Sequence, residues 1–190
     1  IQYVLKIDIL PVFSLVPSLA LRGLAIWTIF TSIFIHVNEL HLLSNMIALY
    51  FIGRYVEKLL GGKYYLMAFF LCGLGGSLLT IAMAYILHIF WSVSFFDRPH
   101  LGASGAIIGL FAILAKDRPN LQIMGFLFIP PFLVLPLLAQ AKWLLMIQLV
   151  LDTILGFAAF PFDNIAHFSH VGGMITGILL YRYFLWRVIY

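Results

Sequence analysis

Small residues run from Gly102 to Gly109 and carry one hydroxyl, that of Ser104, where an apolar segment begins. A serine between small neighbours is open to an approaching substrate. The first N–H groups of a helix also lack intrahelical partners and carry partial positive charge. Both properties suit a nucleophile in acyl transfer. The same residue types suit a tight crossing between two membrane helices, so the run alone leaves catalysis and packing open as interpretations.

A serine nucleophile needs a base within hydrogen-bond reach to react at neutral pH. We take His170 as the candidate base, because small residues follow it as they follow Ser104. Glycines spaced by four let two helices approach closely, and this spacing predicts a crossing just beneath the serine and the histidine. The glycine pairs are Gly105 with Gly109 and Gly173 with Gly177.

Donors for a developing oxyanion are also present. His41 and Asn45 are four residues apart, so on a helix they share one face. Together with the backbone N–H of Ser104 they form a candidate oxyanion hole. We expect no carboxylate to stand where it could orient His170, because Asp163, the nearest in sequence, lies in the preceding loop. The predicted catalytic unit is therefore a Ser-His dyad.

Composition places this chemistry in a membrane. Apolar residues make up 64% of the 190 residues and charged residues only 9%, and the mean hydropathy is +1.09. Soluble domains are about 45–50% apolar and about 25% charged. The basic residues that give a net charge of +4 sit at segment ends and form no patch for nucleic acid. We therefore expect an all-α, polytopic membrane helix bundle that contacts the lipid bilayer and no nucleic acid.

Hydropathy divides residues 1–190, taken as one domain, into five candidate membrane segments. They are residues 39–59, 64–90, 103–116, 141–160 and 167–187. Residues 1–38 are interrupted by charges and prolines, and we expect a loop in the membrane interface with Ile1–Leu5 as the stub of a first helix. The chain has no initiating Met, so we expect a fragment whose start is missing. Residues 121–140 contain three prolines and are expected to form a connector that dips along the inner interface.

The segment at 103–116 is too short to cross a bilayer. At about 1.5 Å per residue it reaches roughly 21 Å, whereas a bilayer core is roughly 30 Å thick. Lys116, Asp117 and Arg118 hold its far end at a surface. The end with Ser104 must then stop inside the membrane, which is tolerable only where protein or water surrounds it.

Basic residues predict the orientation. Eight Lys and Arg residues fall on one side of the predicted membrane and three on the other, and the richer side is cytoplasmic by the positive-inside rule. The segment starts at His41, Ser104 and His170 then share one depth, and the active site opens to the extracytoplasmic side of a cell membrane. The eight are Arg54, Lys58, Lys63, Lys116, Arg118, Lys142, Arg182 and Arg187, and the three are Lys6, Arg22 and Arg98.

These motifs together resemble those of the rhomboid family of intramembrane serine proteases, of the prokaryotic type. They are Gly102-Ala103-Ser104-Gly105 for G-x-S-G, His170 to Gly177 for H-x-x-G-x-x-x-G, and His36, His41 and Asn45 for H-x-x-x-x-H-x-x-x-N. The resemblance covers about residues 24–187. It implies a six-helix core, with the first helix mostly missing here. It also implies Ser104 as nucleophile, His170 as general base, and His41 and Asn45 as oxyanion side chains.

The resemblance implies a substrate class as well. Single-span membrane proteins would enter sideways past residues 141–160, with the loop Pro161–Ala166 as a lid, and would be cleaved near the outer face. Two positions depart from the family pattern. Thr28 follows Trp27 where arginine is usual, and Ile108 stands where an aromatic residue often packs on the histidine ring. Neither departure removes a reacting atom.

Other function classes stay open on the sequence. A metalloprotease would use several of the six histidines, but no H-E-x-x-H is present, and His36 to His41 has one residue too many for H-x-x-E-H. A small transporter or a catalytically inactive rhomboid-like binding protein would also place polar groups at depth. Inactive relatives are expected to lose the serine or the histidine, and both are present here. We expect no cofactor and no metal.

The remaining polar residues have structural interpretations. His36, His100 and His167 lie near the interface and are expected to be solvated or structural. Asn45 alone could serve as a hydrogen bond between helices. Asp152 is an ionisable group within a span, which is costly in a membrane, and we expect it to be a protonated or hydrogen-bonded structural residue.

Overall fold

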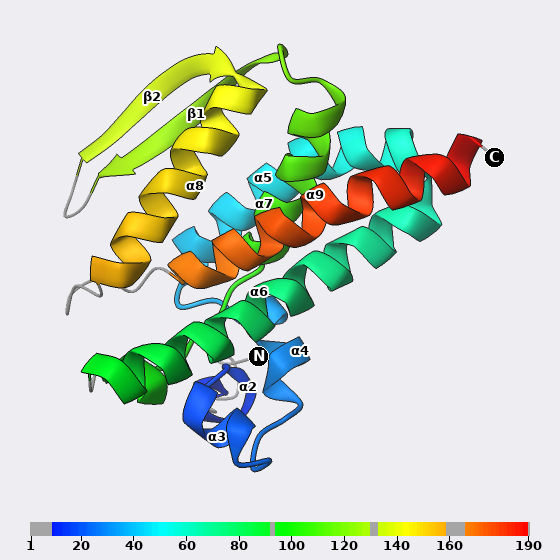
Figure 1. Ribbon diagram of the computed structural model, residues 1–190. Coiled ribbons are helices and arrows are strands. Elements are labelled where there is room, and N and C mark those ends of the chain that lie inside the picture. Colours follow the sequence, from blue (N-terminus) through cyan, green and yellow to red (C-terminus); the bar gives the residue numbers. More distant parts are fainter. Residues whose placement is uncertain (1–8, 92–93, 130–132, 159–165, 190) are drawn as a thin grey trace.

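Helices form a single bundle with a two-stranded hairpin at its side in the computed structural model (Figure 1). The structure describes residues 9–91, 94–129, 133–158 and 166–189. The first elements are the short helices α2 (Leu10–Phe13), α3 (Pro17–Leu21) and α4 (Thr28–Thr31) and the 3₁₀ turn η1 (Ser32–Phe34). They are followed by α5 (Glu39–Leu60), α6 (Gly62–Trp91), the 3₁₀ turn η2 (Ser94–Asp97), α7 (Ser104–Asp117), β1 (Gln122–Ile129), β2 (Leu133–Gln140), α8 (Ala141–Ala158) and α9 (His167–Ile189).

Each of the five apolar segments lies on one of the helices α5 to α9, with ends within two residues of those expected. The ends of α5 show why the sequence sets them. The Asn38 side chain caps its start by accepting a hydrogen bond from the N–H of His41 at 2.8 Å. Gly61, with φ of 78°, ends it in a conformation that favours glycine.

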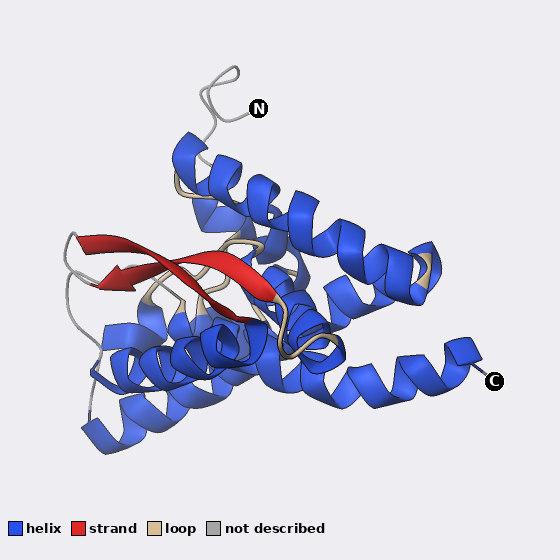
Figure 2. Ribbon diagram, turned by 90° about the horizontal axis from the view of Figure 1, so that it is seen from above, coloured by secondary structure: helices blue, strands red, loops and turns tan. Residues whose placement is uncertain are grey.

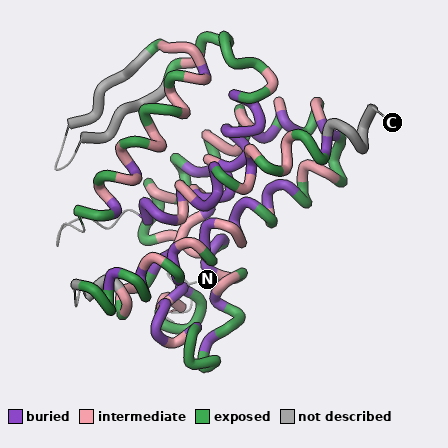
Figure 3. Tube along the Cα trace, in the orientation of Figure 1, coloured by how far each residue is buried: buried purple, intermediate pink, exposed green. Residues whose placement is uncertain are grey.

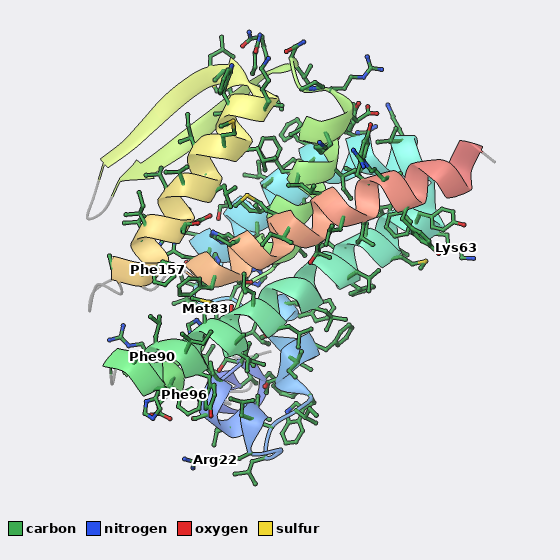
Figure 4. The ribbon with its side chains drawn as sticks, viewed as in Figure 1. Arg22, Lys63, Met83, Phe90, Phe96 and Phe157 are labelled. Atoms are coloured by element: carbon green, nitrogen blue, oxygen red, sulfur yellow. The ribbon has the colours of Figure 1, made fainter. Side chains whose placement is uncertain are left out.

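Two helices in the described part of the chain are long and apolar enough to span a bilayer. They are Gly62–Phe90 and Ala141–Ala158, whose 18-residue windows have mean hydropathies of 2.0 and 1.5. Figure 4 marks Lys63 near the start of α6 and Phe90 near its end, and the helix runs along the whole bundle between them. Most of α8 is uncovered, and its exposed side chains include Trp143, Met146, Val150 and Ile154.

α7 lies at the centre of the bundle. Between Gly105 and Ala115 every residue except Ile108 is buried, and buried positions gather along the middle of the molecule (Figure 3). α7 packs against α5, α6, α8 and α9. A helix that is apolar all round belongs in such a core. The short segment that carries Ser104 is thus the element around which the longer helices pack.

α7 and α9 touch backbone to backbone. A Cβ placed on Gly173 would overlap the carbonyl oxygen of Gly105, and a Cβ on Gly177 would overlap that of Gly109. The two glycine pairs therefore face each other, as in membrane helix dimers built on small residues. This confirms the close crossing that the glycine spacing predicts.

The N-terminal helices hold the loop that leads into α7. Leu15 and His100 exchange two backbone hydrogen bonds, with N–O distances of 2.8 and 2.7 Å. The N–H of Gly102 donates to the carbonyl of Ser32 at 2.9 Å. The expected interfacial loop therefore forms a platform of short helices, and this platform contacts the loop that comes directly before Ser104. The expected helix stub at 1–5 lies outside the described residues.

Other hydrogen bonds brace this platform in place of the arginine that the resemblance leads one to expect. Thr28 is fully buried, and its hydroxyl donates to the carbonyl of Ala25 at 2.6 Å. The Nε1–H of the neighbouring Trp27 donates to the carbonyl of Val12 at 2.9 Å. Thr28 thus stabilises the loop by a local hydrogen bond to its own backbone, in place of a charged side chain.

Asp117 joins three helices at the far end of α7. Its carboxylate accepts hydrogen bonds from the hydroxyl of Tyr55 on α5 and from that of Tyr181 on α9, the latter at 3.3 Å. Arg118 forms an ion pair with the same carboxylate at 3.4 Å. The basic ends of α5, α7 and α9 therefore lie together, at the end of the bundle opposite Ser104.

The connector expected at residues 121–140 consists of two β-strands. β1 and β2 pair as an antiparallel hairpin with Gln122 opposite Gln140, and the hairpin lies across one side of the bundle (Figure 2). Pro136 stands within β2, opposite Phe126. In a sheet of two strands each strand is an edge, so a proline without an N–H is tolerated there.

We predict that Gly173→Ala destabilises the bundle. The new methyl group meets a backbone carbonyl of α7, which cannot move aside as a side chain can, and we expect a loss of about 1–3 kcal/mol in the free energy of unfolding. Gly62→Ala is the matched control, because a Cβ at Gly62 has its nearest neighbour at 3.8 Å. Thermal unfolding in detergent measures both variants. Equal melting temperatures would contradict the close crossing.

Candidate active site

Ser104 is the first residue of α7, and its hydroxyl faces the ring of His170. The Oγ of Ser104 lies 2.8 Å from the Nε2 of His170, across the crossing of α7 and α9. Ser104 is half-buried and His170 is buried. Since Ala103 supplies no side-chain cap, the first N–H groups of α7 are left to face the same space as the hydroxyl. The two residues predicted to react are therefore in contact.

A carboxylate stands on the other side of the His170 ring. The Nδ1 of His170 lies 3.2 Å from each oxygen of Asp152 on α8. Asp152 is 1% exposed and also lies 2.7 Å from the Nδ1 of His167. The expectation that no carboxylate stands beside His170 is wrong, because α8 brings one in from 18 residues away. Asp163, the alternative considered from the sequence, lies outside the described residues.

Sequence reasoning placed Asp152 within a span and missed its partner. One signal was available: Gln148 and Asp152 are four residues apart, on one face of a mostly apolar stretch. The structure joins them by a hydrogen bond of 2.8 Å from the Gln148 amide to the carboxylate. Such a pair marks a helix face turned toward protein rather than lipid. It does not reveal which histidine that face meets.

His41 lies beside the loop glycine that precedes the nucleophile. A Cβ built on Gly102 would lie 3.1 Å from the Nε2 of His41 and 3.7 Å from the Oγ of Ser104. Gly102 has a φ of +114°, a conformation that L side chains rarely adopt. The missing side chain therefore leaves room for His41 and Ser104 to face a common space.

Asn45 is buried on the same face of α5. Its side-chain amide donates to the carbonyl of His41, one turn earlier, at 2.8 Å. This bond turns the amide toward the start of α5, where His41 lies. It uses one of the two N–H donors that the amide possesses.

His36 stacks edge-on against His41, with ring centroids 5.0 Å apart. Burial, and next the neighbouring His41, lower the pKa of His36 below its ordinary value, and a hydrogen bond with the backbone of Phe34 opposes them. His36 is therefore neutral at neutral pH. Its Nε2 is buried and has no hydrogen-bond partner among the described residues.

Of the two alternatives expected for His100 and His167, solvated or structural, their burial favours the structural one. His100 is 8% exposed and His167 is 5% exposed. His100 joins the N-terminal platform to the loop before α7 through its backbone, and His167 contacts Asp152. Both therefore support the elements that meet at Ser104.

A small polar cavity lies next to Gly102 and Ala106. Polar residues from the platform, α6, the loop before α7 and α9 line it: Ser32, Ser77, Thr80, His100 and Ser169. The hydroxyl of Thr80 is buried and has no hydrogen-bond partner in the described part of the chain. A polar cavity with an unsatisfied hydroxyl is a typical site for a bound water.

Asp152, His167 and His170 offer one oxygen and two nitrogens within 4.8 Å of one another, a donor set that zinc uses in proteins. The same atoms are already at hydrogen-bond distance, since Asp152 lies 2.7 Å from one ring and 3.2 Å from the other. Each group therefore has a partner within the trio. The remaining nitrogen of His170 faces Ser104, as a general base requires.

Comparison with known proteins identifies the family. Residues 24–187 match the model of the rhomboid domain. The chain therefore belongs to the rhomboid family, whose members are integral membrane proteins and are generally serine proteases.

Individual relatives agree with this assignment. The chain is 28% identical over 173 residues to RHOMBOID-like protein 1 of Arabidopsis thaliana, covering 90% of this chain and 37% of that protein. It is 26% identical over 156 residues to the rhomboid protease GluP of Bacillus subtilis, covering 80% and 24%. It is 29% identical over 154 residues to RHOMBOID-like protein 5 of Arabidopsis thaliana, covering 81% and 42%. The chain thus spans less than half the length of these relatives.

We predict that Gly102→Ala costs more stability than Gly23→Ala. Both glycines have a positive φ, 74° at Gly23 and 114° at Gly102, so an alanine at either position is strained by its backbone conformation. Only at Gly102 does the new methyl group also press on His41, at 2.9 Å, whereas nothing lies within 4 Å at Gly23. Thermal unfolding in detergent compares the two variants. If they lose the same stability, His41 does not lie against the loop.

Proposed function

We propose that this chain is an intramembrane serine endopeptidase that hydrolyses peptide bonds in or near transmembrane segments of other membrane proteins. The observation that carries the proposal is the 2.8 Å contact between the Oγ of Ser104 and the Nε2 of His170. Membership of a family that is generally proteolytic supports it. So does the burial of the site within a bundle of apolar helices.

The contact supports acyl transfer in two stages. The Oγ of Ser104 attacks the scissile carbonyl carbon while its proton passes to the Nε2 of His170. The C–N bond then breaks as His170 returns that proton to the leaving amine, and an acyl-enzyme remains on Ser104. Water attacks the ester with His170 again as base, and the proton finally returns to the Oγ of Ser104. The polar cavity beside Gly102 is a suitable source of that water.

The oxyanion of each tetrahedral intermediate needs donors that are in place before it forms. We assign this role to the backbone N–H of Ser104 and the side chains of His41 and Asn45. The uncapped start of α7 supports the first assignment. The approach of His41 to Gly102 supports the second, and the second N–H of the Asn45 amide supports the third.

The same arrangement supports a proposal for the orientation in the membrane. Asp117 gathers the basic ends of α5, α7 and α9 at the end opposite Ser104, and we assign that end to the cytoplasm by the positive-inside rule. The active site then opens to the extracytoplasmic side of a cell membrane. We propose single-span membrane proteins as substrates, entering past the exposed apolar face of α8. The lid expected at 161–166 lies outside the described residues, apart from Ala166.

A catalytically inactive rhomboid-like protein is the second candidate function. The relatives include proteins named only as rhomboid-like. This second function requires that Ser104 and His170 lie in contact but do not cleave a substrate. A direct test of the nucleophile separates the two functions.

We predict that a fluorophosphonate probe labels the protein at Ser104. Ser104→Ala removes the nucleophile, so labelling should vanish and cleavage of a reconstituted single-span substrate should fall by at least about 10³-fold. Ser44→Ala, which removes an exposed serine of α5, is the matched control and should behave as the wild type. Peptide mapping by mass spectrometry locates the adduct. A folded wild type that resists the probe would favour the inactive relative.

We also predict that chelators leave activity unchanged. The proposed chemistry uses a serine and a histidine and needs no Lewis acid, so EDTA and phenanthroline should alter substrate cleavage by less than a factor of two. The same assay with added Zn²⁺ after chelation is the control. Loss of cleavage in EDTA that Zn²⁺ restores would assign the trio of Asp152, His167 and His170 to a metal instead.

A further inference from the structure

We propose that Asp152 is a positioning residue that fixes the ring and the tautomer of His170, so that the reacting unit is Asp152-His170-Ser104 rather than a dyad. This inference rests on the proposed function of Ser104 and His170. It goes beyond that function because it assigns a role in the reaction to an aspartate of α8, a mostly apolar helix with several exposed side chains.

α8 packs one narrow face against α9, the helix that carries His170. Gln148, Asp152 and Gly156 are spaced by four residues, so they form a stripe along one side of the helix. At Gly156 the backbone of α8 meets the ring of Phe168 on α9, where an added Cβ would lie 2.9 Å from the ring. This close approach brings the next residue of the stripe, Asp152, against the first turn of α9.

The Asp152 carboxylate is fully enclosed and hydrogen-bonded. It is 1% exposed, and it lies 2.7 Å from the Nδ1 of His167, 2.8 Å from the amide of Gln148 and 3.2 Å from the Nδ1 of His170. The last atom is equally distant from both carboxylate oxygens. A buried carboxylate is costly unless donors surround it, and three N–H groups do so here.

This arrangement selects one tautomer of His170. An acceptor beside Nδ1 requires that Nδ1 carry the hydrogen, and the Nε2 lone pair is then free to accept the proton of Ser104. When the Oγ of Ser104 attacks, that proton moves to Nε2 and the ring becomes a cation. The hydrogen on Nδ1 stays in place, and the Asp152 carboxylate remains ionised and stabilises the cation.

Asp152 also holds the ring in place of an aromatic side chain at position 108, beside an edge contact with the ring of His167, whose centroid lies 6.3 Å away. Ile108 stands one turn after Ser104, and an aliphatic side chain provides no ring face for the imidazole to pack on. The hydrogen bond from Nδ1 to the carboxylate limits rotation of the His170 ring instead. The ionisable groups that face His170 are Asp152 from α8, His41 from α5 and His167 from its own helix, so Asp152 is the anion among the groups described around the ring.

The competing interpretation is that Asp152 only fastens α8 to α9. Its shorter contact, 2.7 Å to His167, would be sufficient for that purpose. The two interpretations differ in which histidine Asp152 must contact for activity: His167 if it fastens α8 to α9, and His170 if it positions the ring. A fastening role is lost when either partner of the Asp152–His167 bond is removed, whereas a positioning role survives the loss of His167 and disappears with the carboxylate.

The test compares Asp152→Asn with His167→Phe in native membranes, where the variants need not survive detergent. We expect Asp152→Asn, which is nearly isosteric, to slow fluorophosphonate labelling of Ser104 by at least tenfold, toward the roughly 10⁴-fold loss that this substitution causes in Ser-His-Asp enzymes. In substrate cleavage the loss should appear in kcat, with KM unchanged. His167→Phe should keep at least a third of the wild-type labelling rate.

Thr153→Val is the matched control, because it removes a polar group of α8 whose hydroxyl bonds only within its own helix among the contacts described. It should label as the wild type does. Equal losses in Asp152→Asn and His167→Phe, or a wild-type rate in Asp152→Asn, would overturn the positioning role while leaving the serine assignment intact. Absence of labelling in the wild type itself would instead refute the proposed function.

Discussion

The contact between Ser104 and His170 depends on one constraint, the backbone approach of α7 to α9. A nucleophile on one membrane helix and a base on another can share a proton only if the helix axes come close near both side chains. Facing glycines provide that approach, because a Cβ on Gly173 or Gly177 would overlap a carbonyl of α7. The resulting seam lies just below the serine and fixes its distance to the imidazole at 2.8 Å. The same seam therefore packs α7 against α9 and brings Ser104 into contact with His170.

The rest of the bundle holds the buried start of α7 in place. The chain must turn inside the molecule before Ser104, and the platform of short helices satisfies its backbone there through Leu15 and Ser32. The positive φ of Gly102 leaves room for His41 beside the turn. At the other end, Asp117 ties α7 to α5 and α9. α7 is thus held at both ends. Although it is too short to span a bilayer, its N-terminal end is supported by the rest of the bundle.

Much of this arrangement could be predicted from the sequence, because the signals are local. The long helices follow from apolar runs with caps such as Asn38 and Gly61, and the crossing follows from glycines spaced by four. The hairpin was missed because prolines argue against strands in a sheet interior, whereas Pro136 stands in a sheet that has only edges. The partner of Asp152 was missed for a different reason. Nothing in the spacing of residues 148–156 states which helix that face of α8 will meet.

We propose that Ser104, His170 and His41 at the start of α7 together accommodate a tetrahedral oxyanion on Ser104. An experimental structure of the protein after reaction with a fluorophosphonate tests it most directly, because the adduct mimics that intermediate. We expect phosphorus bonded to the Oγ of Ser104, the Nε2 of His170 within about 3 Å of that oxygen, and the phosphonyl oxygen directed at His41 and the N–H of Ser104. An adduct whose phosphonyl oxygen points away from His41, or an imidazole turned away from Ser104, would contradict it.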